Sequence, residues 1–302
     1  MNRKDCEFVT LTTGRRIAFA EYGDARGQPV FFFHGWPSSR TMGELTETSA
    51  RELGVRIISP DRPGICGSTF QPNRKLLDWP PVVEELANHL KIEDFRVLAF
   101  SGGAPYGFAT AWRMRGRARA IAIVSGAPPI AELSDHGGLL PLYRWMIWFH
   151  QHQPNLLRSL FYAARPLVSL RSTVRMAQRL LRMLPPSDAE ALRNRVAFDI
   201  CFESQRNAWR GSAEGVIRDA RIYGEPWGFR LEDVDVPVRL WHGIADRAFS
   251  FHIAQEVARR LPNCTARFIE DEGHYSTPIR RMREILADLI SVNAGRRISD
   301  AD

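Results

Sequence analysis

Three residues whose side chains can act together on a carbonyl group each follow a separate apolar run. Ser101 comes after the run RVLAF, Asp246 follows VRLWH, and His274 follows ARFI. A serine hydroxyl is a weak nucleophile at neutral pH, and a histidine that takes its proton activates it. An aspartate can hold that imidazole in the required tautomer and stabilise its charged form. The order Ser, Asp, His therefore predicts nucleophilic attack by Ser101 and a covalent acyl-serine.

Small residues flank Ser101, as a sharp turn from strand to helix requires. Ala99 and Gly103 stand two positions before and after it, where such a chain packs against itself. The helix expected next directs its N-terminal amides at the serine, which favours negative charge there. The oxyanion that forms during attack needs two backbone N–H donors. The expected donors are Gly102 and Trp36, the latter in the loop HGWP.

Other acids and histidines compete for these roles. Asp135 and Glu132 follow an earlier strand and are alternative acids, whereas Asp271 is interpreted as a solvated loop charge. His34 and His242 precede glycines at strand ends, where loop packing and hydrogen bonding are expected of a histidine. The remaining histidines are expected in helices or loops: His89, His136, His150, His152 and His252.

Neither a metal centre nor an organic cofactor is predicted. His150 and His152 have a spacing that suits a metal ion, but no cysteine or carboxylate partners accompany them. The cysteines are far apart and form no CxxC pair, so free thiols in a reducing compartment are expected. They are Cys6, Cys66, Cys201 and Cys264.

Alternating strand and helix signals position the candidate residues, and they predict an α/β fold with a mostly parallel sheet covered by helices. The predicted strands are Phe8–Thr10, Arg16–Tyr22, Pro29–His34, Val55–Ser59, Arg96–Phe100, Ala120–Ser125, Val238–His242 and Ala266–Ile269. The helices predicted between them are Ser39–Leu53, Asp78–Leu90, Ala104–Arg115, Phe251–Leu261 and Ile279–Val292. Ligands of such a sheet bind beyond the carboxyl ends of its strands, where Ser101, Asp246 and His274 stand.

Residues 128–229 show no convincing strand and are punctuated by prolines. Apolar residues recur there at helical spacing. The helical segments are Leu139–His150, Leu156–Leu170, Val174–Leu184 and Ala189–Arg206. We therefore expect a core of residues 1–127 and 230–302, with residues 128–229 inserted as a helical lid (cap) domain.

Two side-chain patterns in the lid bear on the substrate. Trp145, Trp148 and Phe149 lie near helical spacing, and they either pack the lid onto the core or line an apolar acyl pocket. Four arginines fall on one helical face: Arg171, Arg175, Arg179 and Arg182. They form either a solvated face or a surface that attracts anionic substrates or a membrane.

The composition excludes several classes of protein. Of the 302 residues, 44% are hydrophobic and 25% are charged, with a net charge of +7, values typical of a globular protein. The basic residues are nearly all arginines spread along the chain, which argues against nucleic-acid binding. No apolar signal region opens the chain and no run is long enough to cross a membrane. A cytoplasmic location without integral membrane contact is expected.

Five segments together resemble the α/β-hydrolase superfamily over nearly the full length of the chain, and in particular its lidded, esterase-like serine hydrolases. They are HGWPSSR (34–40), DRPGICGS (61–68), AFSGGAPYG (99–107), WHGIADRAF (241–249) and EGHYSTP (272–278). The resemblance implies a catalytic triad of Ser101, Asp246 and His274, and an oxyanion hole formed by the backbone amides of Trp36 and Gly102.

The sequence departs from some patterns of this superfamily. Ala99 replaces the usual glycine before the nucleophile, although it is still small. HGWP also occurs in epoxide hydrolases and dehalogenases, which carry an aspartate where Ser101 stands. Proline iminopeptidases carry HGGPG in the first loop and a tryptophan beside the nucleophile, and this sequence has neither. Asp61, in the segment DRPG, is expected to stabilise its loop.

The resemblance implies the catalytic machinery but not the substrate, and we expect hydrolysis of a carboxylic ester of a small to medium apolar substrate. The alternatives with the same triad are a thioesterase, a lactonase, a peptidase and a carbon–carbon hydrolase or cyclase. An alternative from another class is a ligand receptor of the same fold with weak turnover. We expect the protein to bind a small-molecule substrate and not to bind nucleic acid. A homodimer is also a possible assembly.

Overall fold

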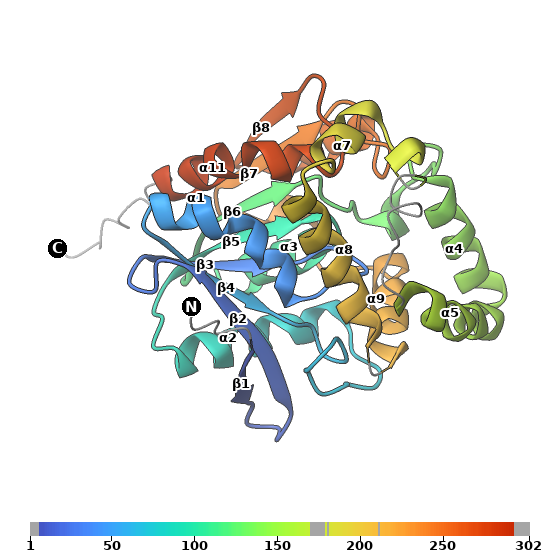
Figure 1. The fold of residues 1–302 in the computed structure, drawn as a ribbon. Helices are drawn as coiled ribbons and strands as arrows, with labels where there is room; N and C mark the ends of the chain where they lie inside the picture. Colours follow the sequence, from blue (N-terminus) through green and yellow to red (C-terminus); the bar gives the residue numbers. More distant parts are fainter. Residues whose placement is uncertain (1–5, 170–178, 180, 211, 293–302) are drawn as a thin grey trace.

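The computed structural model describes residues 6–169, 179, 181–210 and 212–292 (Figure 1). Its sheet has eight strands in the order β1-β2-β4-β3-β5-β6-β7-β8. The strands are β1 Glu7–Thr10, β2 Arg16–Gly23, β3 Gln28–Phe33, β4 Val55–Pro60, β5 Phe95–Phe100, β6 Ala118–Val124, β7 Val238–Gly243 and β8 Cys264–Ile269. β2 pairs antiparallel with β1 and β4, and all the other pairs are parallel. The predicted mostly parallel sheet is confirmed, with small shifts at the strand ends.

Helices cover both faces of the sheet, so its central strands are buried on both sides. In β3, Phe31 and Phe33 belong to one buried cluster, whereas Val30 and Phe32 belong to the other. The first cluster includes side chains of α2 Trp79–His89, α3 Ala104–Arg113 and α10 Phe251–Arg260, and the second includes those of α1 Glu47–Glu52 and α11 Ser276–Ser291. Burial on both faces explains the unbroken apolar run of β3.

The segment before α1 differs from the predicted single helix capped by Ser39. Residues Arg40–Thr46 form a 3₁₀ helix, and the Ser39 hydroxyl bonds to Thr41 Oγ1 at 3.0 Å instead of capping. The carboxylate of Asp61 accepts from the Arg40 backbone N–H at 2.6 Å and pairs with its guanidinium. A tertiary contact therefore fixes the start of this segment, and Asp61 stabilises its loop as the resemblance implied.

A group of helices connects β6 to β7, and Figure 1 shows α4, α5 and α9 together at one side of the sheet. The helices are α4 Pro141–His152, α5 Pro154–Ser169, α7 Pro186–Ala191, α8 Arg195–Trp209 and α9 Glu214–Gly224. The sequence does not predict α9. Arg171, Arg175 and much of the predicted helix Val174–Leu184 lie outside the described residues, while Arg179 and Arg182 are exposed.

These helices are joined to the sheet by shared buried clusters. Phe198 and Cys201 of α8 lie in the same cluster as strand residues of one face, and Ile222 and Tyr223 of α9 lie in the cluster of the other face. α8 and α9 are therefore packed on the sheet. Within the described part of the chain, none of the helices has the length and apolar character needed to cross a bilayer.

Candidate active site

The chain turns sharply at Ser101, directly after β5 and before α3. The φ angle of Ser101 is +52°, a left-handed conformation that costs a residue with a side chain about 1–3 kcal/mol. A Cβ on Gly103 would lie 2.1 Å from the carbonyl oxygen of Phe33, and a Cβ on Gly107 would lie 2.9 Å from the Cβ of Ala99. This close packing accounts for the small residues that the sequence places around the serine.

The structure brings the three residues at separate strand ends into one hydrogen-bonded row. His274 Nε2 lies 2.9 Å from Ser101 Oγ, and His274 Nδ1 lies 2.8 Å from Asp246 Oδ2. In this arrangement the serine O–H donates to Nε2, and the Nδ1–H donates to the carboxylate. All three side chains are buried. The arrangement can remove a proton from the hydroxyl while the aspartate fixes the imidazole tautomer.

The carboxylate of Asp246 is held by the loop that follows it. Its Oδ1 accepts from the backbone N–H groups of Ala248 and Phe249 at 2.7 and 3.2 Å. The imidazole of His242 lies 3.8 Å from Oδ2 and donates instead to the carbonyl oxygen of Phe249 at 3.0 Å. The carboxylate therefore keeps Oδ2 directed at His274.

The charges of Asp246 and His274 stabilise each other in the buried site. Burial alone would lower the pKa of His274, but the adjacent Asp246 carboxylate outweighs burial and raises this pKa above 6.5. Burial alone would raise the pKa of Asp246, but the imidazole outweighs it and the pKa lies below its usual value. Near neutral pH, Asp246 is therefore ionised and His274 can take up and return a proton.

Asp188 of α7 supports the loop that carries His274, and no pattern in the sequence marks this residue. Its carboxylate accepts from the backbone N–H groups of His274, Tyr275 and Ser276 at 3.1, 2.9 and 2.8 Å. These groups lie at the start of α11, where a helix has unpaired N–H groups. A carboxylate there also interacts favourably with the helix dipole. Only the tertiary fold brings Asp188 to this position.

The two predicted oxyanion donors lie on adjacent backbone segments beside the serine. A Cβ on Gly102 would lie 3.1 Å from the backbone nitrogen of Trp36 and 2.8 Å from its Cβ. A Cβ on Gly35 would lie 3.3 Å from the Cβ of Ser101. The loop after β3 therefore runs directly against the turn after β5, and only glycine fits at these positions without displacing a neighbour.

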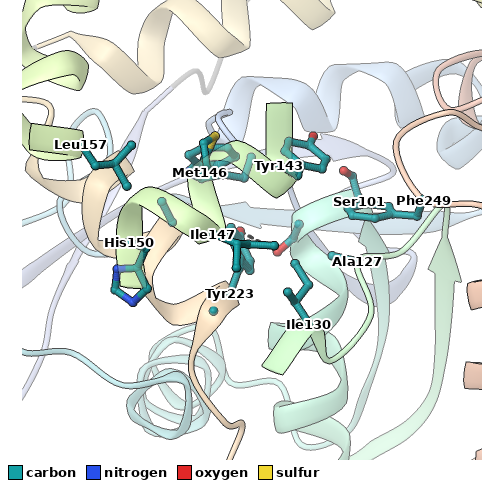
Figure 2. Close-up of a pocket in the computed structure, with 14 residues that line it drawn as sticks. Ser101, Ala127, Ile130, Tyr143, Met146, Ile147, His150, Leu157, Tyr223 and Phe249 are labelled. Carbon is teal, nitrogen blue, oxygen red and sulfur yellow. Dashed lines mark hydrogen bonds between the residues drawn. The ribbon is translucent and has the colours of Figure 1, made fainter. Parts of the chain in front are cut away.

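An apolar pocket opens beside Ser101 (Figure 2). α4 contributes Tyr143, Met146, Ile147 and His150 to its wall. The other lining residues are Trp36, Ser101, Gly102, Ala127, Ile130, Leu157, Ala220, Tyr223, Gly224 and Phe249. The pocket suits an uncharged apolar group because most of its wall is hydrocarbon.

The expected pocket residues Trp145, Trp148 and Phe149 do not line this pocket. Trp145 and Trp148 are 67% and 51% exposed, and both border a separate surface hollow. Phe149 packs on a cluster next to the pocket. The pocket face of α4 follows the spacing i, i+3, i+4, i+7 from Tyr143, so a residue two positions later lies about 200° around the helix. The three rings therefore lie on another face of α4 than the residues that line this pocket.

A second hollow adjoins the other side of Ser101. It shares Trp36, Ser101 and Tyr143 with the first pocket, but it is also lined by His274, which the first pocket is not. Its wall is more polar and includes Gln205 and Arg247, together with Asp188. The serine thus lies between an apolar space and a more polar one.

The competing acids have other partners. Asp135 is exposed and accepts from the backbone N–H of Gly137 at 2.8 Å, and Glu132 pairs with Arg260 at 2.7 Å. The buried imidazole of His34 donates from Nδ1 to the carbonyl oxygen of Gly35 at 3.0 Å. In the described part of the chain, no three His, Cys, Asp or Glu side chains gather in a way that could hold a metal ion.

Comparison with known proteins gives both sequence and structural relatives. A family model described as "Alpha/beta hydrolase family" matches residues 30–289. The chain is 22% identical over 257 residues to an uncharacterized hydrolase, YcgS, of Bacillus subtilis, covering 82% of this chain and 85% of that protein. It is 29% identical over 130 residues to a non-heme chloroperoxidase of Streptomyces lividans, covering 42% of this chain and 47% of that protein.

Solved structures share the fold over almost the whole chain. An esterase of Exiguobacterium antarcticum superposes with a TM-score of 0.67 at 18% identity, covering 94% of this chain and 99% of that one. A bromoperoxidase of Bacillus anthracis superposes with a TM-score of 0.69 at 17% identity, covering 95% of this chain and 100% of that one. With the family model matching most of its length, the chain belongs to the alpha/beta hydrolase family.

Proposed function

We propose that the protein is a serine hydrolase that cleaves a carboxylic ester of a small to medium apolar substrate through an acyl-serine. The observation that carries this proposal is the row Ser101–His274–Asp246, with its distances of 2.9 and 2.8 Å. The left-handed turn at Ser101 further presents its hydroxyl at the carboxyl end of the sheet. The substrate is a small molecule, and the proposed hydrolysis needs no cofactor.

In the first half of the reaction, Ser101 Oγ attacks the ester carbonyl carbon and its proton passes to His274 Nε2. The carbonyl π electrons move to oxygen, and the N–H groups of Trp36 and Gly102 bind this oxyanion. Each such donor contributes about 3 kcal/mol to the transition state. Collapse breaks the bond to the leaving alcohol, which takes the proton from His274. An acyl-serine remains.

In the second half, water replaces the alcohol. His274 Nε2 takes a proton from the water as its oxygen attacks the acyl carbon, and the same two amides bind the second oxyanion. When this intermediate collapses, the bond to Ser101 Oγ breaks and Nε2 returns the proton to it. The acid product leaves, and the serine is restored.

The apolar pocket and the more polar hollow, which both border Ser101, suggest how the substrate lies. His274 must reach the leaving oxygen, and it lines the more polar hollow with Gln205 and Arg247. We assign the alcohol part of the ester to that hollow and the acyl part to the apolar pocket of Figure 2. In this proposal residues 128–229 act as a lid, with α4 and α9 forming walls of the acyl pocket.

The test is turnover by a Ser101→Ala variant on a short-chain aryl ester, with intact-mass detection of an acyl adduct after acid quench. We expect kcat to fall by about 10⁶, as for loss of a triad nucleophile, and the adduct to disappear. Ser159→Ala is the matched control, because Ser159 is exposed on α5 and its hydroxyl bonds only to the Asn155 carbonyl within the described structure. Activity of the Ser101 variant within about tenfold of wild type would reject the proposal.

A further inference from the structure

Each candidate oxyanion donor shares a peptide plane with a carbonyl group. That carbonyl accepts a hydrogen bond on the side of the plane opposite to the donor N–H. In a planar trans peptide the C=O and the N–H point in opposite directions. The carbonyl of Gly35 therefore sets the direction of the Trp36 N–H, and the carbonyl of Ser101 sets that of the Gly102 N–H. Whatever binds these two carbonyls determines whether the two amides converge on one oxyanion.

The Gly35 carbonyl is bound by two buried side chains. The guanidinium of Arg62 donates from Nη2 to Gly35 O at 2.8 Å and from Nη1 to His34 O at 2.7 Å. The imidazole of His34 adds a third bond, from Nδ1 to Gly35 O at 3.0 Å. On the other plane, the backbone N–H of Ala127 donates to Ser101 O at 3.0 Å. Arg62 is thus the one side chain in this set that clamps two successive carbonyls of the oxyanion loop.

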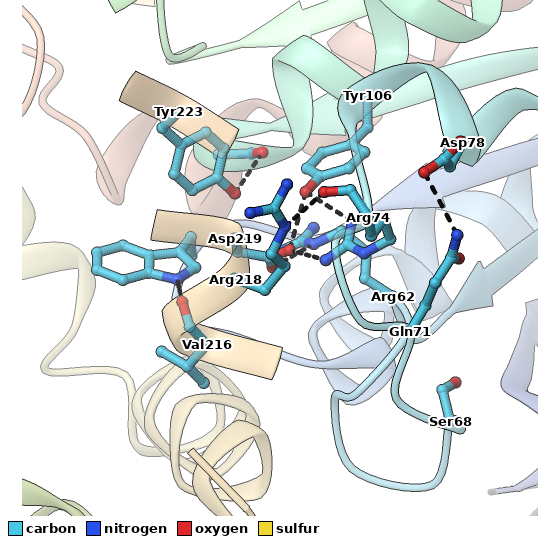
Figure 3. Close-up of polar contacts among 12 residues, drawn as sticks. Arg62, Ser68, Gln71, Arg74, Asp78, Tyr106, Val216, Arg218, Asp219 and Tyr223 are labelled. Atoms are coloured by element: carbon cyan, nitrogen blue, oxygen red, sulfur yellow. Dashed lines mark hydrogen bonds and ion pairs between the residues drawn. The ribbon is translucent and has the colours of Figure 1, made fainter. Parts of the chain in front are cut away.

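Arg62 is itself fixed by Asp219, which lies on α9 (Figure 3). Arg62 Nε donates to Asp219 Oδ2 at 2.7 Å, and Arg74 pairs with the other carboxylate oxygen. The hydroxyl of Tyr106 donates to Asp219 Oδ1 at 2.8 Å. These side chains are all buried. Burial alone would raise the pKa of Asp219, but the two guanidinium groups outweigh it and lower that pKa, so the carboxylate is ionised.

The same face of α9 makes two further contacts with the loops beside the serine. The indole Nε1 of Trp36 donates to the carbonyl oxygen of Val216 at 2.9 Å. The hydroxyl of Tyr223 donates to the carbonyl oxygen of Gly102 at 2.8 Å. Positions 216, 219 and 223 follow the spacing i, i+3, i+7, which is one face of a helix. α9 therefore contacts the oxyanion loop and the serine turn through one continuous row.

We propose that Arg62, held by Asp219 of α9, is a positioning residue that aims the Trp36 N–H at the oxyanion. This inference rests on the proposed hydrolase function, because it assumes that the Trp36 amide is a donor. Arg62 touches neither the substrate nor the reacting atoms in this proposal. It acts through the Gly35–Trp36 peptide plane. A part of the chain that covers the substrate site thereby also sets the geometry of the transition-state contacts.

The test compares Arg62→Lys with Arg74→Lys. Both variants keep a buried positive charge beside Asp219, but only Arg62 bonds to the carbonyls of His34 and Gly35. A lysine cannot bridge two carbonyls and a carboxylate with fixed geometry as a guanidinium does. We expect Arg62→Lys to lower kcat by about 10²–10³, the effect of losing one oxyanion donor, with KM changed less than about threefold. Arg74→Lys should keep kcat within about threefold.

A second readout separates positioning from general damage to the fold. The carbonyl carbon of a trifluoromethyl ketone forms a bond to Ser101 Oγ, the proton of the Ser101 hydroxyl passes to His274, and the ketone oxygen becomes a negatively charged oxygen in the oxyanion hole. Its affinity should fall by the same factor as kcat/KM in Arg62→Lys, whereas the affinity for the matching methyl carbinol, which cannot form an oxyanion, should not change. Unfolding curves of the two lysine variants check that they are comparably folded.

Several outcomes would overturn the inference. It fails if folded Arg62→Lys keeps kcat and ketone affinity, or if Arg74→Lys loses both to the same degree. If Arg62→Lys does not fold, Asp219→Asn decides, since it keeps the size of the side chain and weakens the hold on Arg62. Unchanged ketone affinity in that variant overturns the inference as well. An active Ser101→Ala enzyme would instead reject the proposed function, so the two failures are distinguishable.

Discussion

Two helices between β6 and β7 face the same pocket but are held to the protein in different ways. α9 is anchored by buried side chains, among them Val216, Asp219 and Tyr223, and by hydrogen bonds to the loops beside Ser101. α4 has no buried residue along its whole length, and its Trp145 is 67% exposed. One wall of the pocket is therefore anchored to the loops beside Ser101, whereas the other wall has no buried residue.

α4 and α9 therefore differ in how firmly they are attached to the rest of the protein. Segments with few buried apolar contacts open at lower free energy than the core. We therefore expect α4 to move when substrate enters, while α9 stays with the sheet. Changes on the anchored side, which comprises the sheet ends and α9, should impair chemistry or folding, and changes on α4 should alter only substrate preference.

Among the changes that compare the anchored side with α4, the largest effect is expected after β7. Asp246→Asn should lower kcat by about 10⁴, because the amide imposes the wrong imidazole tautomer. His274 must be neutral to accept a proton, and the Asp246 charge raises its pKa. The acid limb of kcat/KM should thus have its midpoint above about 6.5 in the wild type and shift to lower pH in the variant. A pH–rate profile of both proteins measures this. An Asp135→Asn variant that reproduced the loss would move the acid to the loop after β6.

The next largest effect tests the anchor of α9. Asp219→Ala leaves Arg62 and Arg74 buried without their carboxylate, so the free energy of unfolding should fall by about 3–5 kcal/mol. Trp148→Ala on α4 is the comparison, and exposed positions of this kind change stability by about 0.5 kcal/mol or less. Urea denaturation of both variants gives the two values. Equal losses would remove the distinction between the two helices.

The smallest effect concerns the length of the acyl chain. Met146→Ala on the pocket face of α4 should move the optimum of a straight-chain ester series to longer chains. Each newly buried methylene contributes about 0.8 kcal/mol, which is up to about fourfold in kcat/KM. Trp148→Ala, on the outer face of the same helix, should leave the profile unchanged. A shift with Trp148→Ala and none with Met146→Ala would place the acyl chain on the other side of α4.

The fold and the serine turn could be predicted because their signals are local. Strands buried on both faces are continuous apolar runs, and the turn at Ser101 needs small residues at fixed offsets, which Ala99 and Gly103 supply. The row Ser101–His274–Asp246 followed from the strand ends at which its members stand. The first two inferences depend on residues within a few positions of each other, whereas the row depends on the rule that the carboxyl ends of parallel strands lie at one edge of the sheet.

The supports of the site could not be predicted, because their partners are far apart in the chain. Asp219 looks like an ordinary charge on an amphipathic helix until Arg62 and Arg74 are placed beside it. Asp188 likewise resembles an acidic residue in the first turn of a short helix. The pocket face of α4 depends on the rotation of that helix about its axis, which aromatic content alone does not determine.

Exchange of the helices between β6 and β7 among related proteins would disturb more than the apolar pocket. Residues 128–229 include Asp188, whose carboxylate binds the N–H groups where the loop that carries His274 enters α11. A graft that lacks a carboxylate there would weaken the loop even if both splice junctions were perfect. In directed evolution, substrate range is better altered through the pocket-facing positions of α4, such as Met146 and Ile147, because their replacement leaves that support in place.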